Sequence, residues 1–289
     1  MRRPGEPGSR SDAREEGRVD EKGGETGRQN QGWAVVTGAS SGIGWELARN
    51  LAAEGWDLVI TARRQDALEA LAREARERWG REVHVVPADL AGRPGVEHLL
   101  EALERLDLEP DILVNNAGFG DYGSFEEAEL DRVLQMIELN VSSLTHLTRV
   151  LLPGMLERGR GRILNVASTA AFQPGPLMAV YYATKSYVLS FSEALREEAR
   201  GTGVTITTLC PGPTTSEFHA EAGMMASPLV QRFPMPGSRQ VAEYGVRALM
   251  KGKGVAVYGV LNRLHVFGLR FLPRSLVLRL VRRVQEIRS

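Results

Sequence analysis

The stretch WAVVTGASSGIGWELARNLAAEG, residues 33–55, decides the fold class. A short apolar run precedes a glycine-rich turn, and alanine and leucine at helical spacing follow the turn. Gly38, Gly42 and Gly44 let the backbone turn tightly and approach a phosphate, and Gly55 is placed to end the helix. The helix N-terminus would stabilise the negative charge of a pyrophosphate. A strand, a glycine-rich turn and a helix in this order predict a dinucleotide site.

The rest of the chain repeats the alternation of apolar runs and amphipathic helical stretches. The runs are WAVVTG, WDLVITA, VHVVPA, DILVNNAG, GRILNVAS, VTITTLCPG and GVAVYGV. Their nearly continuous apolar character is typical of parallel strands that are covered on both faces. The pattern therefore predicts an α/β fold, a doubly wound (Rossmann-type) parallel seven-stranded sheet with helices on both faces. Residues 32–260 are expected to form one domain, with ligands bound at the carboxyl ends of the strands.

Composition excludes several classes of protein. Lys+Arg and Asp+Glu both number 36, so no overall field favours nucleic acid, and no metal site is predicted. Cys210 is the single cysteine, which excludes an intramolecular disulfide, fits a cytoplasmic location and predicts a buried, inert thiol. The glycine- and charge-rich residues 1–31 are expected to be a disordered tail. No apolar run reaches the roughly 18 residues that a membrane-spanning helix requires.

The segment AVYYATKSYVLSF, residues 179–191, poses the question of which tyrosine works with Lys185. On a helix, Lys185 lies about 40° round from Tyr181 and about 60° round from Tyr182 in the other direction, so either ring can meet the amine. A half-buried aromatic beside a solvated cation is the simpler interpretation of such a pair. Spacing within this segment leaves these alternatives open.

From Trp33 to about Tyr258 the chain resembles the short-chain dehydrogenase/reductase family. It carries, in order, TGASSGIG at 37–44, ADL at 88–90, NNAG at 115–118, Asn140 in ELNVSS, Ser168 in NVAST, YYATK at 181–185 and PG at 211–212. The family pattern is Tyr-x-x-x-Lys with a serine about thirteen residues before the tyrosine, and only Tyr181 satisfies both spacings. Tyr182 then occupies a position where the family usually carries a small residue.

The resemblance implies an oxidoreductase that transfers a hydride between a nicotinamide cofactor and a carbonyl or secondary alcohol. It assigns Tyr181 as the acid/base and Ser168 as the hydrogen-bond partner of the substrate carbonyl. It also implies that Lys185 holds the nicotinamide ribose and that Asn140 anchors a water of a proton relay. A phenol has a pKa of about 10, and a neighbouring ammonium is expected to favour its ionisation.

The end of the second strand predicts the type of cofactor. The sequence there is DLVITARRQDAL, which places Ala62, Arg63 and Arg64, and no carboxylate, at the end of the strand. A carboxylate would bind the ribose 2′-OH of NAD, whereas arginine suits the 2′-phosphate of NADP(H). Two solvated arginines are the alternative, but cations at a helix start oppose its dipole. NADP(H) is therefore the predicted cofactor, with Arg63 as its direct contact.

The resemblance implies further cofactor contacts. They come from Ser40, Ser41 and Ile43 with the three glycines of the turn, from Asp89 and Leu90, from Asn116, Ala117 and Gly118, from Tyr181 and Lys185, and from Pro211, Gly212, Thr214 and Ser216. Ser216 replaces the threonine that usually contacts the carboxamide. The following residues 217–237 contain Phe218, Met224, Met225, Leu229, Phe233 and Met235. They predict an adaptable lid over a lipophilic substrate, or a lid that packs on its own core.

Residues 261–289 are predicted to be a basic C-terminal extension. Residues 262–289 hold seven arginines and one glutamate. An amphipathic helix is predicted near Pro273, with Leu276, Val277, Leu280, Val281, Val284 and Ile287 on one side and Arg279, Arg282, Arg283 and Glu286 on the other. The helix either docks on the domain or on a second subunit of a homo-oligomer, or it lies peripherally on an anionic membrane. The sequence leaves two alternative functions open. One is a redox-inactive sensor or scaffold that binds NADP(H), and the other is a membrane-surface protein that works through this basic helix.

Overall fold

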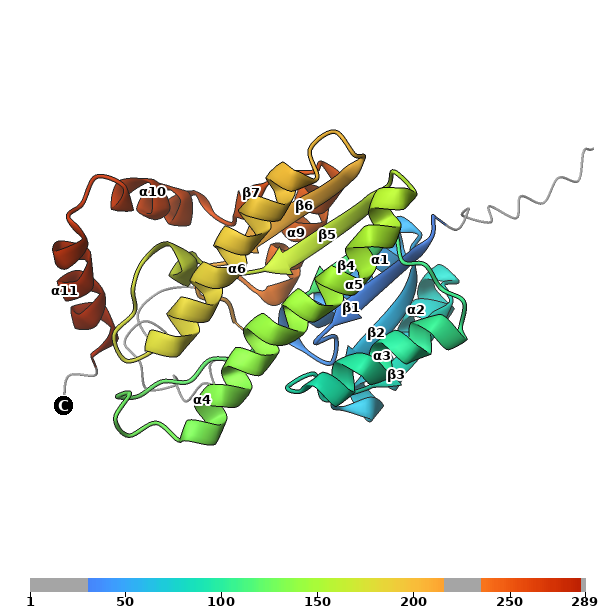
Figure 1. Cartoon of the computed structure of the whole chain (residues 1–289), viewed down its shortest axis with the longest axis horizontal. Helices are drawn as coiled ribbons and strands as arrows, with labels where there is room; N and C mark the ends of the chain where they lie inside the picture. Colours follow the sequence, from blue (N-terminus) through green and yellow to red (C-terminus); the bar gives the residue numbers. More distant parts are fainter. Residues whose placement is uncertain (1–30, 216–234, 287–289) are drawn as a thin grey trace, which may run out of the picture.

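The strands form one parallel sheet in the computed structural model, which describes residues 31–215 and 235–286 (Figure 1). They are β1 (Trp33–Thr37), β2 (Asp57–Ala62), β3 (Val83–Pro87), β4 (Ile112–Asn115), β5 (Gly161–Val166), β6 (Val204–Cys210) and β7 (Val255–Val257). Their order in the seven-stranded sheet is β3-β2-β1-β4-β5-β6-β7. From β1 to β3 successive strands are added towards one edge of the sheet, and from β4 to β7 towards the other edge, so the strand order reverses between β1 and β4. Doubly wound folds bind ligands at this point. The predicted fold class is confirmed.

Helices cover both faces of the sheet. One face carries α1 (Gly42–Glu54), α2 (Gln65–Trp79) and α9 (Ser238–Met250), and the other carries α3 (Arg93–Arg105), α5 (Leu144–Glu157) and α6 (Ala179–Glu198). The other α-helices of residues 31–215 and 235–286 are α4 (Leu130–Ile137), α10 (Val260–Leu269) and α11 (Arg274–Gln285). Figure 1 shows α10 and α11 at one end of the molecule, away from α2 and α3. None of the described helices combines the length and apolar character needed to cross a bilayer.

The sheet separates two hydrophobic cores. Successive residues of a strand point to opposite faces, so Ala34 and Val36 of β1 pack under α1 while Val35 packs on the other side. Leu58 and Val59 of β2 divide in the same way. Both faces of each strand are therefore buried, which explains the continuous apolar runs in the sequence.

Two glycines set the entry and exit of α1. A Cβ on Gly44 would lie 2.2 Å from the carbonyl oxygen of Gly38, so only glycine allows the turn to pack this closely on the helix. Gly55 has φ 106° and ends the helix, with its N–H directed to the carbonyls of Leu51 and Ala52. Both assignments from the sequence are confirmed.

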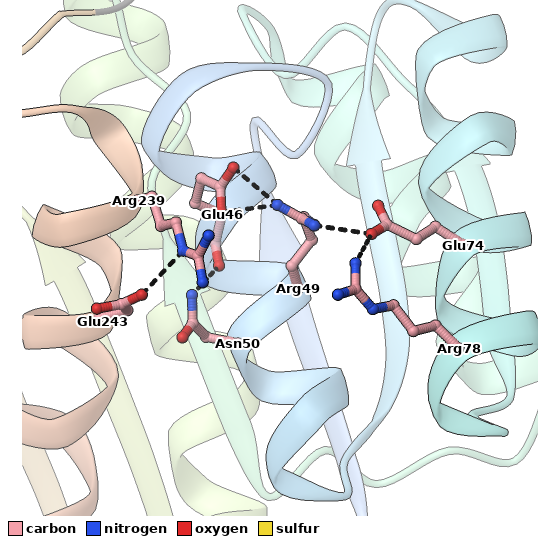
Figure 2. A network of polar contacts seen from close by, with 7 residues as sticks. All are labelled: Glu46, Arg49, Asn50, Glu74, Arg78, Arg239 and Glu243. Atoms are coloured by element: carbon pink, nitrogen blue, oxygen red, sulfur yellow. Dashed lines mark hydrogen bonds and ion pairs between the residues drawn. The ribbon is translucent and has the colours of Figure 1, made fainter.

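An ion-pair network lies on the outer surface of the α1 layer (Figure 2). Arg49 of α1 contacts Glu46 at 3.1 Å and Glu74 of α2 at 2.8 Å. Burial acts to lower the pKa of Arg49, but the bonds to Glu74 and Glu46 outweigh it and raise the pKa. Partly exposed pairs of this kind contribute about 0.5 kcal/mol each, so the two helices are held mainly by the buried core beneath them.

Candidate active site

A large cavity runs along the carboxyl ends of the strands, with a volume of about 1320 Å³. It is lined by residues that follow β1 to β6 directly in the sequence. Every predicted site residue within the described ranges lines it except Asn140. Ser216 and the predicted lid residues Phe218, Met224, Met225, Leu229 and Phe233 lie outside the described residues, as does the predicted tail. Met235 does line the cavity.

The turn between β1 and α1 forms one end of the cavity. Glycine keeps the turn compact here, because a Cβ on Gly38 or Gly44 would meet neighbouring atoms of Asn116 or of Gly38 itself. The first N–H groups of α1 face this end and have no partners within the helix. A cradle of backbone N–H groups without side chains fits a pyrophosphate, so the residues present fit a dinucleotide.

Arg63 and Arg64 line the same end and are both exposed. Arg64 reaches from the start of α2 to the turn after β1, where its Nε donates to Ser40 Oγ at 3.3 Å and its Nη2 to the Ser40 carbonyl at 3.3 Å. The sequence predicted Arg63 as the direct cofactor contact, which stays a prediction, and the structure shows that Arg64 is bonded to the glycine-rich turn. Both guanidinium groups stand where β2 ends, and neither of the two residues next to them, Ala62 and Gln65, carries a charge.

Asn116 acts in the structure as a positioning residue. Its Nδ2 donates to the carbonyls of Thr37 at 3.0 Å and Gly38 at 3.2 Å. Thr37 Oγ1 accepts from the backbone N–H groups of Asn116 and Ala117, each at 3.0 Å. The loop after β4 is thereby clamped to the turn after β1. The sequence analysis did not single out Thr37, although a threonine directly before the glycine-rich turn was a visible signal.

Ser168 and Tyr181 meet beyond the end of β5. Ser168 begins the short 3-10 helix Thr169–Phe172, and its Oγ accepts from the backbone N–H of Ala170 at 3.1 Å. A side-chain hydrogen bond joins Ser168 to Tyr181. Burial raises the pKa of Tyr181 above its ordinary value, and the bond to Ser168 lowers it only in part. The phenol is therefore neutral at pH 7 and carries a proton that it can donate.

Lys185 lies one helical turn after Tyr181 and is buried. Its Nζ donates to the carbonyl of Val166 at 2.9 Å and lies 5.9 Å from the centre of the Tyr181 ring. Burial lowers the pKa of Lys185 to about 8. The sequence analysis expected this ammonium to favour ionisation of Tyr181. In the structure desolvation governs both groups, so the pKa of Tyr181 is raised instead.

Asn140 lies behind the cavity in a π-helical turn, Glu138–Ser143, between α4 and α5. Its Oδ1 accepts from the N–H of Phe119 at 3.1 Å, and its Nδ2 donates to the Phe119 carbonyl at 2.9 Å and to Thr184 Oγ1 at 3.1 Å. A Cβ on Gly118 would lie 2.8 Å from this Oδ1. Asn140 thus fixes the loop after β4 from behind, while its role in a water relay stays a prediction. The π-helical turn was not predicted, and such turns often occur at functional sites.

The description "short chain dehydrogenase" belongs to the family model that matches residues 32–226. The chain belongs to this family. It is 38% identical over 184 residues to a very-long-chain 3-oxoacyl-CoA reductase of Anas platyrhynchos, which covers 62% of this chain and 58% of that protein. A putative ketoacyl reductase of Streptomyces coelicolor is 39% identical over 181 residues, covering 62% of this chain and 69% of that protein.

Solved structures agree with this assignment. A short-chain dehydrogenase from Sphingobium yanoikuyae in complex with NADPH has a TM-score of 0.73 and 28% sequence identity. The alignment covers 89% of this chain and 98% of that one. The likeness in fold therefore extends over nearly the whole described structure. In contrast, the chain described here spans just over half the length of the 3-oxoacyl-CoA reductases that it matches.

Tyr182 of this short-chain dehydrogenase turns away from Ser168 and contacts the C-terminal helix. Gln285 Nε2 of α11 donates to its hydroxyl at 2.6 Å, and burial raises the pKa of this phenol to about 12. A Cβ on Gly175 would lie 2.3 Å from the ring, so glycine is needed to accommodate it. The hydroxyl of Tyr122 donates to the backbone carbonyl of Gln285. The two adjacent tyrosines therefore serve different partners, and Tyr181 is the one beside Ser168.

Apolar residues of α10 and α11 form the other end of the cavity. They are Val260 and Leu261 from α10 and Leu280, Val281 and Val284 from α11. Val277, Val281 and Gln285 are buried against the domain, so one side of the predicted amphipathic helix docks on its own chain. The predicted apolar stripe is thus split, because Leu276, Leu280 and Val284 stay exposed.

Cys210 is buried at the end of β6, and burial raises the pKa of its thiol to about 12. The predicted inert thiol is consistent with this position. Within the described residues, no group of histidine, cysteine and acidic side chains could hold a metal ion.

Proposed function

We propose that this chain is an NADP(H)-dependent oxidoreductase that interconverts a lipophilic carbonyl compound and the corresponding secondary alcohol. The observation that carries the proposal is the hydrogen-bonded pair of Ser168 and Tyr181 inside one cavity. One end of that cavity fits a dinucleotide, and α10 and α11 contribute five apolar residues to the other. Membership of the short-chain dehydrogenase family supports the same chemistry.

The mechanism assigns the proton to Tyr181 and the orientation to its neighbours. When bound, NADP(H) supplies or accepts the hydride, which the protein cannot do alone. Tyr181 holds its proton at neutral pH and donates it to the carbonyl oxygen of the substrate as charge develops there. Ser168 positions the phenol and offers its hydroxyl to the same oxygen. A strongly held phenolic proton favours reduction, since the phenol is a ready acid and a poor base.

Two arginines support NADP(H) as the cofactor. Arg63 and Arg64 line the cavity where β2 ends, and their neighbours in the sequence, Ala62 and Gln65, carry no negative charge that would repel a 2′-phosphate. A charge-assisted hydrogen bond of this kind contributes about 1.5 to 3 kcal/mol, which corresponds to roughly 10- to 150-fold in affinity.

The dissociation constants of NADPH and NADH test this assignment, measured by titration of the purified protein. NADPH is expected to bind at least tenfold more tightly, and Arg63→Ala and Arg64→Ala should each narrow the gap, on the scale of one charge-assisted bond. Equal constants for the two cofactors in the unmutated protein would refute the argument. Tight NADPH binding without turnover of any carbonyl compound would instead favour the redox-inactive sensor.

A long-chain 3-oxoacyl thioester is the substrate that we propose. The two relatives are named for 3-oxoacyl-CoA and ketoacyl reduction, and the far end of this cavity is lined by valine, leucine and methionine. Each buried methylene contributes about 0.8 kcal/mol, so kcat/KM should rise by up to about fourfold per added methylene. NADPH oxidation with a series of 3-oxoacyl thioesters of increasing chain length measures this. Activity confined to the shortest members would exclude a lipophilic substrate.

A further inference from the structure

Exposed apolar side chains are concentrated on α10, α11 and the turn between them. Of the 18 large hydrophobic residues that are exposed in the described structure, ten lie between residues 260 and 284. They are Val260, Leu261, Leu264, Phe267, Phe271, Leu272, Leu276, Leu278, Leu280 and Val284. Single exposed apolar residues are normal on any protein, whereas a concentration of them marks a binding surface. We call these ten residues the terminal apolar surface.

Four of these residues share one side of α10 and of the turn after it. Val260, Leu264, Phe267 and Phe271 follow one another at intervals of three or four residues, so they form a stripe along the helix and into the turn that follows it. Phe267 is 57% exposed and Phe271 is 71% exposed, and their rings contact each other edge to face. Two neighbouring phenylalanine rings facing solvent are costly unless another apolar medium covers them.

Positive charge surrounds the terminal apolar surface. All six arginines between residues 260 and 286 are exposed: Arg263, Arg270, Arg274, Arg279, Arg282 and Arg283. Glu286 is the only acidic residue in that range, and it pairs with Arg282. The partner of this surface should therefore be apolar in its interior and anionic at its edge.

The terminal apolar surface continues into the active-site cavity. Val260, Leu261, Leu280 and Val284 belong to both. The buried side of α11, with Gln285 bonded to Tyr182, holds the helix in place, so its exposed side is not the result of an undocked helix. The outer surface and the cavity therefore share an apolar edge at these four residues.

We propose that the terminal apolar surface docks on an anionic lipid bilayer, with the mouth of the cavity turned towards the lipid. The apolar stripe would enter the boundary between headgroups and acyl chains, and the arginines would contact anionic headgroups. A second copy of the chain fits less well, because two facing surfaces would bring like charges together, and interface cores are depleted of charge. A bilayer satisfies both the apolar stripe and the arginines.

Flotation of the full chain with lipid vesicles tests the proposal without any need for turnover. Vesicles of phosphatidylcholine alone are compared with vesicles that also contain about one third phosphatidylglycerol, at low and at high salt. We expect binding to the anionic vesicles at low salt, much weaker binding to the neutral ones, and release by salt. An unmutated chain that stays unbound on anionic vesicles at low salt would overturn the proposal.

Apolar variants locate the contact. Phe267→Ser/Phe271→Ser should weaken vesicle binding at least about tenfold, on the scale of two lost aromatic anchors. Leu272→Ser/Leu276→Ser has a matched control in Leu106→Ser/Leu156→Ser, since all four residues are 37% to 41% exposed. The control pair lies at the ends of α3 and α5, which precede strands and so lie opposite the cavity. Equal losses in test and control pairs would contradict the assignment of the surface.

Charge variants test the headgroup contact. Arg270→Gln/Arg274→Gln/Arg279→Gln should weaken binding by about fivefold per arginine, or roughly a hundredfold together. Arg73→Gln/Arg105→Gln/Arg247→Gln removes the same charge from other helices and should weaken vesicle binding by less than about fivefold in total. Unchanged melting temperatures show that the variants fold. If light scattering instead shows a dimer that Phe267→Ser/Phe271→Ser dissociates, a second copy covers the surface and the membrane proposal is wrong.

Discussion

Replacement of Lys185 by methionine is expected to stabilise the protein while removing its activity. Lys185 is buried, and its pKa falls from 10.5 to about 8. A shift of this size means that burying the charged amine costs about 3 kcal/mol at pH 7. Methionine has a similar length, fills the same space and carries no charge. Loss of the hydrogen bond to the Val166 carbonyl costs the variant about 1 kcal/mol of stability. Lys185→Met should therefore raise the free energy of unfolding by about 2 kcal/mol.

The stability of the unmutated protein is expected to depend on pH through Lys185. Between pH 8 and 10.5 the folded protein binds fewer protons at Lys185 than the unfolded chain, so the stability of the unmutated protein rises with pH in that window. The gain is about 1.4 kcal/mol per pH unit, which cancels the advantage of the variant near pH 9.5. Below pH 8 the amine is charged in both states, and the full difference persists.

Urea unfolding of the two proteins at pH 7 and pH 9.5, without added cofactor, measures this difference. Lys251→Met serves as the control, because Lys251 is exposed and its replacement should change the stability by less than about 0.5 kcal/mol at either pH. The reasoning fails if Lys185→Met is less stable than the unmutated protein at pH 7. It also fails if the advantage of the variant stays the same at both pH values, since the burial of a charge would then not be its cause.

Three further predictions concern single side chains. Tyr181→Phe should lower the rate of NADPH oxidation with a carbonyl substrate by orders of magnitude, whereas Tyr182→Phe should keep most of it; loss of activity from Tyr182→Phe alone would contradict the assignment of the acid. Tyr182→Phe should nevertheless lower the free energy of unfolding by about 1 to 2 kcal/mol, measured in urea, because Gln285 then loses its buried partner. Gly44→Ala should abolish measurable NADPH binding, since the added Cβ would meet the Gly38 carbonyl at 2.2 Å; tight NADPH binding by this variant would refute the proposed pyrophosphate site.

Local patterns in the sequence were sufficient to predict the sheet and the helices that cover it. Each strand is buried on both faces, so each appears as an apolar run, and turn residues such as Gly55 mark the helix ends. The sequence also predicted where the cavity lies, because the carboxyl ends of parallel strands lie at one edge of the sheet. The resemblance to the short-chain dehydrogenase/reductase family then identified Ser168, Tyr181 and Lys185, which the structure brings together.

Features that depend on distant contacts could not be predicted. The segment ELNVSS resembles any polar helical turn, and only the backbone of Phe119 explains why Asn140 needs a π-helical turn to reach it. The state of Lys185 is a second example. Its neighbours in sequence suggest a cation beside a phenol, whereas the pKa depends on burial that a sequence does not specify.

The C-terminal helix α11 shows both what a sequence pattern predicts and what depends on distant contacts. The sequence predicted the amphipathic helix from its period, but a period does not tell how much of the apolar side is buried. The sequence analysis also did not consider Gln285, whose partner Tyr182 lies 103 positions away. The helix also lies beyond residues 32–226, the part that matches the family. Ser168, Tyr181 and Lys185 therefore lie in the matched part, while Leu280 and Val284, outside it, line the cavity that a substrate would enter. The choice of substrate should accordingly change with α11, and chimeras that exchange this helix between relatives should alter kcat/KM for long acyl chains without altering NADPH affinity.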